Sequence, residues 1–152
     1  MCIDGTPASP YLAKWSCTIQ AAPPPQTAVA RTAAWATATM HHWGLGALAD
    51  DVGLIVAEFS SNAWTHGSPP IVVTLQLQES VLIIEVRDGG PGLALFTGPR
   101  PLGAGGRGFP AAVAIAQEMG VDGRADGTTV WARLYFQWMP AETEPGRETP
   151  ER

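Results

Sequence analysis

The sequence predicts an α+β fold, a two-layer α/β sandwich with helices packed on one face of a largely antiparallel mixed sheet. Two stretches with helical character occupy residues 26–42 and 47–66, and two alternating strands follow at 71–78 and 81–88. A further short helix and a second pair of strands come later in the chain. Consecutive strands joined by short turns favour antiparallel pairing, and the helices before them supply the covering layer.

The bulk composition suits one domain with a real core. The chain has 152 residues, of which 45% are hydrophobic and 15% charged. No apolar run reaches the roughly 18 residues of a membrane span, and the first residues lack a basic-then-apolar signal pattern. We therefore expect a cytoplasmic protein without a membrane partner. Cys2 and Cys17 are expected to be reduced thiols, with a disulfide between them left open.

The charge balance argues against a nucleic-acid partner. The formal net charge is -5, from 9 basic and 14 acidic residues. Binding to a phosphate backbone requires clustered positive charge, which scattered arginines do not provide. If the protein binds a phosphorylated ligand, backbone N–H groups and a metal ion must supply most of the attraction.

The chain divides into a single domain and two tails. Residues 1–10 carry no periodic pattern and are expected to be flexible. The predicted domain spans residues 11–139 and begins with a short strand at 11–20. Residues 140–152 are charged and contain proline, so we expect them to be disordered.

The two main helices have clear boundaries. The Ala-rich first helix follows the PPP run at 23–25 and ends before Gly44. The second ends at Gly67, which precedes a proline pair. Its buried stripe follows helical spacing and consists of Leu48, Val52, Ile55, Phe59 and Ala63.

The rest of the domain is expected to be sheet, loop and one short helix. The first two strands are joined at Glu79-Ser80 by a hairpin-sized turn. Residues 89–108 are rich in glycine and proline and are expected to form a loop. A helix of about ten residues should begin near Phe109. The last strands are predicted at 120–126 and 128–136, with Asp126-Gly127 as the turn.

Three polar side chains recur at four-residue spacing in the second helix. Glu58, Asn62 and His66 form one stripe, which borders the buried stripe instead of facing water. A half-buried carboxylate or amide without a partner costs a few kcal/mol. The stripe therefore either caps loops and pairs internally, or it faces a ligand.

A second carboxylate is directed inward at the end of a strand. By alternation Asp88 shares a face with Leu82, Ile84 and Val86, and the three aliphatic residues make that the core face. The following turn, GGPG at 89–92, has no side chains that would obstruct a ligand. The alternative is a tight turn capped by the Asp88 side chain.

Two further segments are of interest. Residues 103–110, GAGGRGFP, place glycines ahead of a predicted helix, where backbone N–H groups can face an anion. Thr128 alternates with Val130 and Ala132, so its hydroxyl should point inward. Alone, each pattern is more often structural than functional.

The order of these motifs is specific. E-x-x-x-N-A-x-x-H on a helix is followed by D-x-G-x-G after a strand, G-x-x-G-x-G before a helix, and G-T-T on a strand. This order resembles the ATP-binding domain shared by histidine kinases, gyrase, the heat-shock chaperone and mismatch-repair ATPases. The resemblance covers residues 26–136 and implies the Bergerat-type fold of that superfamily. Within it, the chain looks most like the small anti-sigma-factor serine/threonine kinases.

The resemblance implies roles for the helix residues. Asn62 would coordinate Mg²⁺ that bridges the phosphates of ATP. Glu58 would be the catalytic base that orients or deprotonates the attacking hydroxyl group. His66 completes the motif without a catalytic assignment.

The resemblance also implies roles for residues outside that helix. Asp88 would accept the adenine amino proton, with Gly90 and Gly92 letting the base approach the backbone. Thr128 would support adenine through water. The lid around the phosphates would include Gly103, Gly105, Arg107 and Gly108.

Two classes of function follow from the resemblance. The first is an ATP-dependent serine/threonine kinase that phosphorylates an anti-sigma-factor antagonist and binds a sigma factor. The second is a non-catalytic ATP-binding partner-switch module. Because a module that only binds could lose its base without penalty, the presence of Glu58 and Asn62 favours the kinase. A homodimer is left open.

Overall fold

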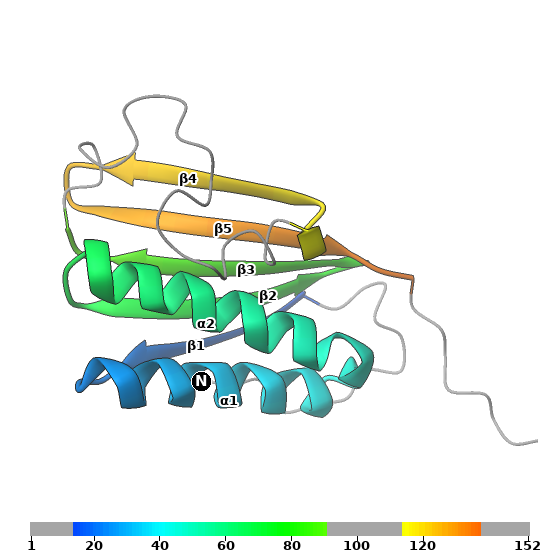
Figure 1. Cartoon of the computed structure of the whole chain (residues 1–152). Helices are drawn as coiled ribbons and strands as arrows, with labels where there is room; N and C mark the ends of the chain where they lie inside the picture. Colours follow the sequence, from blue (N-terminus) through cyan, green and yellow to red (C-terminus); the bar gives the residue numbers. More distant parts are fainter. Residues whose placement is uncertain (1–13, 91–113, 138–152) are drawn as a thin grey trace, which may run out of the picture.

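The computed structural model of the chain describes residues 14–90 and 114–137. In this part of the chain, two long helices cover one face of a five-stranded sheet (Figure 1). The elements, in chain order, are β1 (Lys14–Ala21), α1 (Pro25–His42), the short 3-10 helix η2 (Gly46–Leu48), α2 (Ala49–His66), β2 (Ile71–Gln78), β3 (Val81–Asp88), β4 (Glu118–Arg124) and β5 (Gly127–Tyr135).

The sheet has the strand order β1-β2-β3-β5-β4, and each neighbouring pair is antiparallel. β5 therefore lies between β3 and β4, although it is the last of these strands along the chain. The predicted α+β sandwich is confirmed, and every described strand pair is antiparallel.

Local chemistry accounts for the ends of the helices. α1 begins at Pro25, whose fixed φ and missing N–H suit a first helical turn. It ends just before Gly44, which takes the left-handed conformation with a φ of 73°. The first turn of α2 contains Asp50 and Asp51, whose negative charges complement the helix dipole.

The two helices pack closely against each other. A Cβ atom on Gly53 would lie 2.6 Å from the Thr37 hydroxyl, so α1 and α2 approach at a point where a side chain would not fit. Farther along, the Thr32 and Ser60 hydroxyls are 3.4 Å apart and form a buried hydrogen bond. These contacts fix which side of α2 faces α1.

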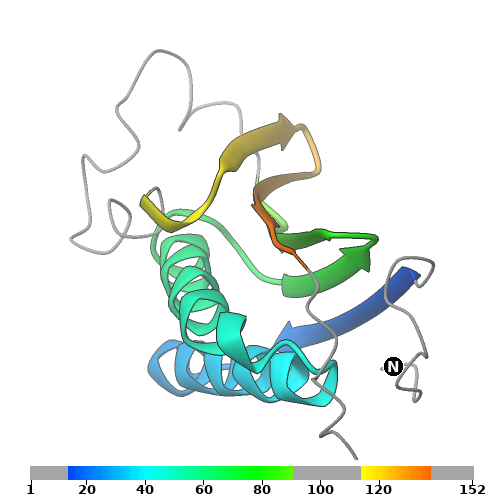
Figure 2. The same cartoon turned by 90° about the vertical axis from the view of Figure 1, so that its right-hand side faces the viewer.

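The core lies between the helices and the inner face of the sheet. Its inward residues alternate along β2 and β3, as the sequence predicts. Those with the lowest exposure include Phe59, Met40, Ile55, Ile71, Val73, Leu75, Leu77, Leu82, Ile84 and Val86. α1 contacts β1, whereas α2 contacts β2 and β3. In Figure 2, β4 and β5 continue beyond α2 on the side away from α1.

Several predicted boundaries are corrected. The first turn of the helix predicted at 47–66 is the 3-10 helix η2, and α2 begins only at Ala49. The last hairpin turns at Ala125-Asp126, one residue earlier than predicted, because β5 already begins at Gly127.

The helix predicted from Phe109 lies mostly outside the described residues. Ala114 and Ile115 are helical, and β4 begins at Glu118, two residues earlier than the predicted strand. The helix therefore ends sooner than a ten-residue element would. Residues 1–10 and 140–152 also lie outside the described part of the chain.

The expectation of two reduced cysteines is wrong for Cys17, which is disulfide-bonded. Its side chain is buried on the inner face of β1.

Candidate functional site

Glu58 and Asn62 lie on the side of α2 that points away from α1. Each is two residues from Ser60, and therefore roughly 160° around the helix from the contact with α1. Phe59, which is fully buried, lies between these two directions and faces the sheet. The polar pair thus borders the core on the side where β5 and β4 extend past the helix (Figure 2).

Neither side chain of this pair makes a polar side-chain contact within the described part of the chain. Glu58 and Asn62 are both half-buried. Within residues 14–90 and 114–137, neither makes a side-chain hydrogen bond or an ion pair. They do not pair with each other and they cap no described loop. His66, in contrast, is exposed in the last turn of α2.

Asp88 is buried at the end of β3, with 7% of its surface exposed. Its Oδ1 atom accepts a hydrogen bond of 2.8 Å from the Gly90 N–H and a longer one of 3.4 Å from the Ser68 N–H. No donor in the described part of the chain binds Oδ2. The carboxylate therefore caps the turn with one oxygen, and its other oxygen is not engaged by the described residues.

Two glycines lie close against Asp88, one at its carboxylate and one at its backbone carbonyl. A Cβ atom on Gly67 would overlap the Asp88 carboxyl carbon and lie 2.7 Å from Oδ1. On the other side, a Cβ atom on Gly127 would lie 2.5 Å from the Asp88 carbonyl oxygen. A side chain at either position would displace Asp88, so the end of α2 and the start of β5 both close on this residue.

Thr128 lies directly across from Asp88 in the β3–β5 pair. It is 3% exposed and belongs to the inward face, as its alternation predicts. The end of α2, the end of β3 and the start of β5 therefore meet at one point. The polar groups gathered there are the Asp88 carboxylate, the Thr128 hydroxyl and the N–H groups of Ser68 and Gly90.

The remaining predicted site residues are one glycine within the described part of the chain and five residues outside it. Gly90 is described and donates to Asp88, so it is part of the site. The others lie outside the described residues: Gly92, Gly103, Gly105, Arg107 and Gly108.

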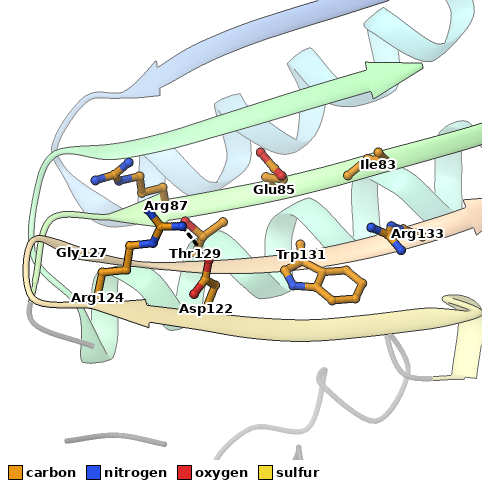
Figure 3. Close-up of a pocket in the computed structure, with 9 residues that line it drawn as sticks. All are labelled: Ile83, Glu85, Arg87, Asp122, Arg124, Gly127, Thr129, Trp131 and Arg133. Atoms are coloured by element: carbon orange, nitrogen blue, oxygen red, sulfur yellow. Dashed lines mark hydrogen bonds and ion pairs between the residues drawn. The ribbon is translucent and has the colours of Figure 1, made fainter. Parts of the chain in front are cut away.

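A second polar region lies on the outer face of the sheet, where the sequence analysis placed no site. It is a groove of about 360 Å³ across β3, β5 and β4 (Figure 3). The outward alternation of charged and aromatic residues in these strands is the signal that could have indicated it. Its lining residues are Ile83, Glu85, Arg87, Asp122, Arg124, Gly127, Thr129, Trp131 and Arg133.

The charges of this outer groove largely neutralise one another. Arg87 pairs with Asp126 at 3.2 Å, Arg124 with Asp122 at 3.4 Å, and Arg133 with Glu118 at 3.1 Å. The Arg133 guanidinium also lies 4.9 Å from the centre of the Trp131 ring. All three ion pairs are exposed, so each adds little to stability.

One carboxyl group beside this groove is electrostatically perturbed. The hydrogen bond from Arg133 lowers the pKa of Glu118, and a further bond from Tyr135 acts in the same direction. The same pairing raises the pKa of Arg133. This is a surface ion-pair effect and marks no separate site.

The described residues contain no group of three or more His, Cys, Asp or Glu side chains that could hold a metal ion. A cation at the inner site would accordingly need ligands from a bound molecule in addition to Asn62. Among the described helices, none is long and apolar enough to cross a membrane.

The fold and the inner site define a two-layer α+β domain in which a helix end and two strand ends meet at a carboxylate, one oxygen of which has no donor among the described residues. Residues 22–134 match the histidine kinase-like ATPase domain family. The chain belongs to this family.

The crystal structure of the RsbU and RsbW domains of Rv1364c from Mycobacterium tuberculosis is similar at 20% sequence identity, with a TM-score of 0.49. The match covers 80% of this chain and 31% of that chain, so this chain spans about a third of the solved one. No curated protein matches the chain.

Proposed function

We propose that this chain binds ATP with Mg²⁺ where α2, β3 and β5 meet, and that it is an anti-sigma-factor-type serine/threonine kinase. In this proposal it phosphorylates an antagonist protein and binds a sigma factor. The family supports the ATP-binding part. The partner proteins rest on the motif resemblance.

The described residues suit a bound nucleotide. Asp88 keeps one acceptor oxygen for the adenine amino group, and Gly67 places no side chain against that carboxylate. Asn62 offers a neutral oxygen to Mg²⁺, which prefers oxygen ligands and shares them with phosphates and water. ATP supplies the transferred phosphoryl group, and Mg²⁺ balances the charge of the phosphates.

Glu58 carries the catalytic part of the proposal. It lies one helical turn from Asn62, about 6 Å along the axis, on the same side of α2. The single observation that supports a role in chemistry is that this half-buried carboxylate makes no ion pair or hydrogen bond within the described chain. A carboxylate repels phosphate, so it is better suited to orienting the partner's hydroxyl group and accepting its proton.

The test separates binding from transfer. Glu58→Gln should keep ATP affinity within a few-fold of wild type and lower phosphotransfer to a candidate antagonist by about 10²-fold or more, the scale of a positioned base. Asn62→Ala should instead weaken Mg²⁺-dependent ATP binding itself. Calorimetry and a radiolabelled transfer assay on the same preparations measure both quantities.

A matched control is available on the other face of the sheet. Glu85 is also half-buried and makes no ion pair or side-chain hydrogen bond within the described residues. Glu85→Gln should leave both binding and transfer unchanged. One outcome would replace the kinase by the non-catalytic partner-switch module. In that outcome wild type binds ATP but transfers no phosphate, and both wild type and Glu58→Gln change their affinity for the partner when ATP is added.

A further inference from the structure

The outer groove contains a carboxylate without a partner near its centre. Across the sheet, Glu85 of β3 lies directly between Thr74 of β2 and Trp131 of β5. It is half-buried, and within the described residues its side chain makes no hydrogen bond or ion pair. The Thr74 hydroxyl, its nearest polar neighbour on β2, already bonds to the Thr18 hydroxyl at 3.2 Å. Neither oxygen of Glu85 is therefore engaged by the part of the chain that the structure describes.

The charges in and around this groove leave Glu85 as the one carboxylate without a counter-charge. Each of the three arginines that line the groove has an acidic partner of its own, and these pairs are Arg87–Asp126, Arg124–Asp122 and Arg133–Glu118. Three guanidinium groups therefore stand against four carboxylates. The excess negative charge is that of Glu85, and a single added cation would balance it.

The arginines closest to Glu85 along the sheet are held by other contacts. Arg87 is two residues away on the same face of β3, yet its guanidinium bonds to Asp126 in the β4–β5 turn at 3.2 Å. Arg133, on the neighbouring strand β5, bonds to Glu118 at 3.1 Å. Because both arginines have a closer acidic partner, Glu85 is open to a cation from elsewhere.

Trp131 forms a fixed wall beside this carboxylate. Its ring lies so close to Gly120 of β4 that a Cβ atom there would overlap the ring atom Cζ2. The Arg133 guanidinium lies 4.9 Å from the centre of the same ring. Figure 3 shows Glu85 and Trp131 on adjacent strands of the groove. A carboxylate beside an aromatic wall suits a guanidinium group, which donates two parallel N–H groups to a carboxylate and packs its flat face on a ring.

We propose that the outer groove docks a partner protein through an arginine side chain, with Glu85 as the acceptor of the guanidinium and Trp131 as the wall beside it. Half-buried Ile83 extends the apolar part of this centre, and the three exposed ion pairs form a polar rim, as at protein–protein interfaces. Arginine suits the groove better than lysine, because an ammonium group is compact and strongly hydrated. The groove lies on the opposite face of the sheet from the proposed nucleotide site, so this inference goes beyond the proposed function.

The probe is a five-residue peptide, blocked at both ends, with arginine at its centre between valine and threonine residues. Two matched peptides carry lysine or citrulline instead, and citrulline keeps the shape of arginine without its charge. Binding to the full chain, without ATP, is followed by NMR through the amide signals of Thr129 and Trp131 and the indole signal of Trp131. We expect millimolar affinity for the arginine peptide, binding about tenfold weaker or less for the citrulline peptide, and an intermediate value for lysine.

Three variants test which charge the peptide reads. Glu85→Gln removes the acceptor charge and should weaken binding of the arginine peptide by about fivefold or more. Asp126→Asn releases Arg87, which can then turn toward Glu85 and compete with the peptide, so affinity should fall by about two- to threefold. Glu79→Gln is the control, because it removes an equal charge from an exposed position in the β2–β3 turn, at the end of β3 away from Arg87. It should keep the wild-type affinity.

Equal binding of the arginine and citrulline peptides, or an unchanged affinity in Glu85→Gln, overturns the inference. N-acetylarginine amide is titrated alongside, and if this single residue binds as tightly as the peptide, the groove is a small-molecule pocket and protein docking is overturned. If combined Arg147→Gln and Arg152→Gln raise the affinity for the peptide several-fold, the chain's own C-terminal residues compete for the groove, and docking of a partner is overturned. None of these results depends on ATP, so each leaves the proposed function intact.

Discussion

Arg87 and Asp88 are consecutive residues at the end of β3, and their charged groups lie in different environments on the two faces of the sheet. Arg87 points outward, its side chain is 54% exposed, and it pairs with an Asp126 side chain that is 75% exposed. Asp88 points inward, is 7% exposed, and is held by backbone N–H groups from two segments. Both charges have partners, but the partners of Asp88 are backbone N–H groups, whereas the partner of Arg87 is an exposed side chain.

This difference explains why the inner site and the outer groove are not equivalent candidates. Side chains at the surface keep many rotamers, so exposed ion pairs exchange easily with water and salt. Backbone donors have fewer conformations than surface side chains before a ligand arrives, which lowers the cost of binding. The outer groove has more charged side chains, yet its charges largely satisfy one another. At the inner site, the second oxygen of Asp88 has no donor among the residues that the structure describes.

The largest difference in stability between the two faces is expected for alanine substitutions at Ile83 and Ile84. Ile84 is fully buried on the inner face, whereas Ile83 is half-buried beside the outer groove. Ile84→Ala should lower the free energy of unfolding by about 2–5 kcal/mol, because the cavity is enclosed by helix and sheet. Ile83→Ala should cost less than half as much. Urea denaturation of the two variants measures both, and equal losses would mean that the outer face is covered.

A smaller difference in the loss of stability is expected between Asp88→Ala and Arg87→Ala. Removing the Asp88 carboxylate leaves the buried N–H of Gly90 without its acceptor, which should cost about 1–3 kcal/mol. Removing Arg87 breaks an exposed ion pair and should cost about 1 kcal/mol or less. Added salt should shrink the second loss and leave the first nearly unchanged. Thermal unfolding at low and high ionic strength checks this, and a salt-sensitive Asp88→Ala would contradict it.

The smallest effect concerns the titration of Glu118 beside the outer groove. The hydrogen bond from Arg133 lowers its pKa below the ordinary value of 4.5. Since the folded pKa is the lower one, this contribution to stability is present above the unfolded pKa and is lost as pH falls through the folded pKa. Carbon-detected NMR titration should show the pKa of Glu118 moving back toward 4.5 in Arg133→Ala. No movement would assign the shift to Tyr135.

Hydrophobic periodicity was sufficient to predict most of the fold. The bounds of β2 and β3 agree with the predicted strands, because apolar alternation there is strict and a two-residue turn fixes the register. The β4–β5 hairpin was less well predicted. β4 reads EMGVDGR, in which two glycines interrupt the alternation and leave the start of the strand and the turn poorly defined.

The candidate site was only partly predictable. Alternation correctly directed Asp88 and Thr128 inward, since their neighbours on the same face are apolar. The contacts of Gly67 and Ser68 with Asp88 could not be predicted from the sequence. They depend on the distance between a helix end and a strand end that are about 20 residues apart in sequence. His66 was placed with the polar stripe but is exposed in the last turn of α2.

The insertion of β5 between β3 and β4 has a consequence during synthesis. On the ribosome the chain emerges from its N-terminal end, so α1, α2 and the β1–β2–β3 part of the sheet are available first. β4 then emerges without its neighbour, because among the described strands it pairs with β5 alone. Thr128 and Gly127 reach Asp88 only with that last strand. A nascent chain stalled after β4 should therefore hold most of its core and still lack one wall around Asp88.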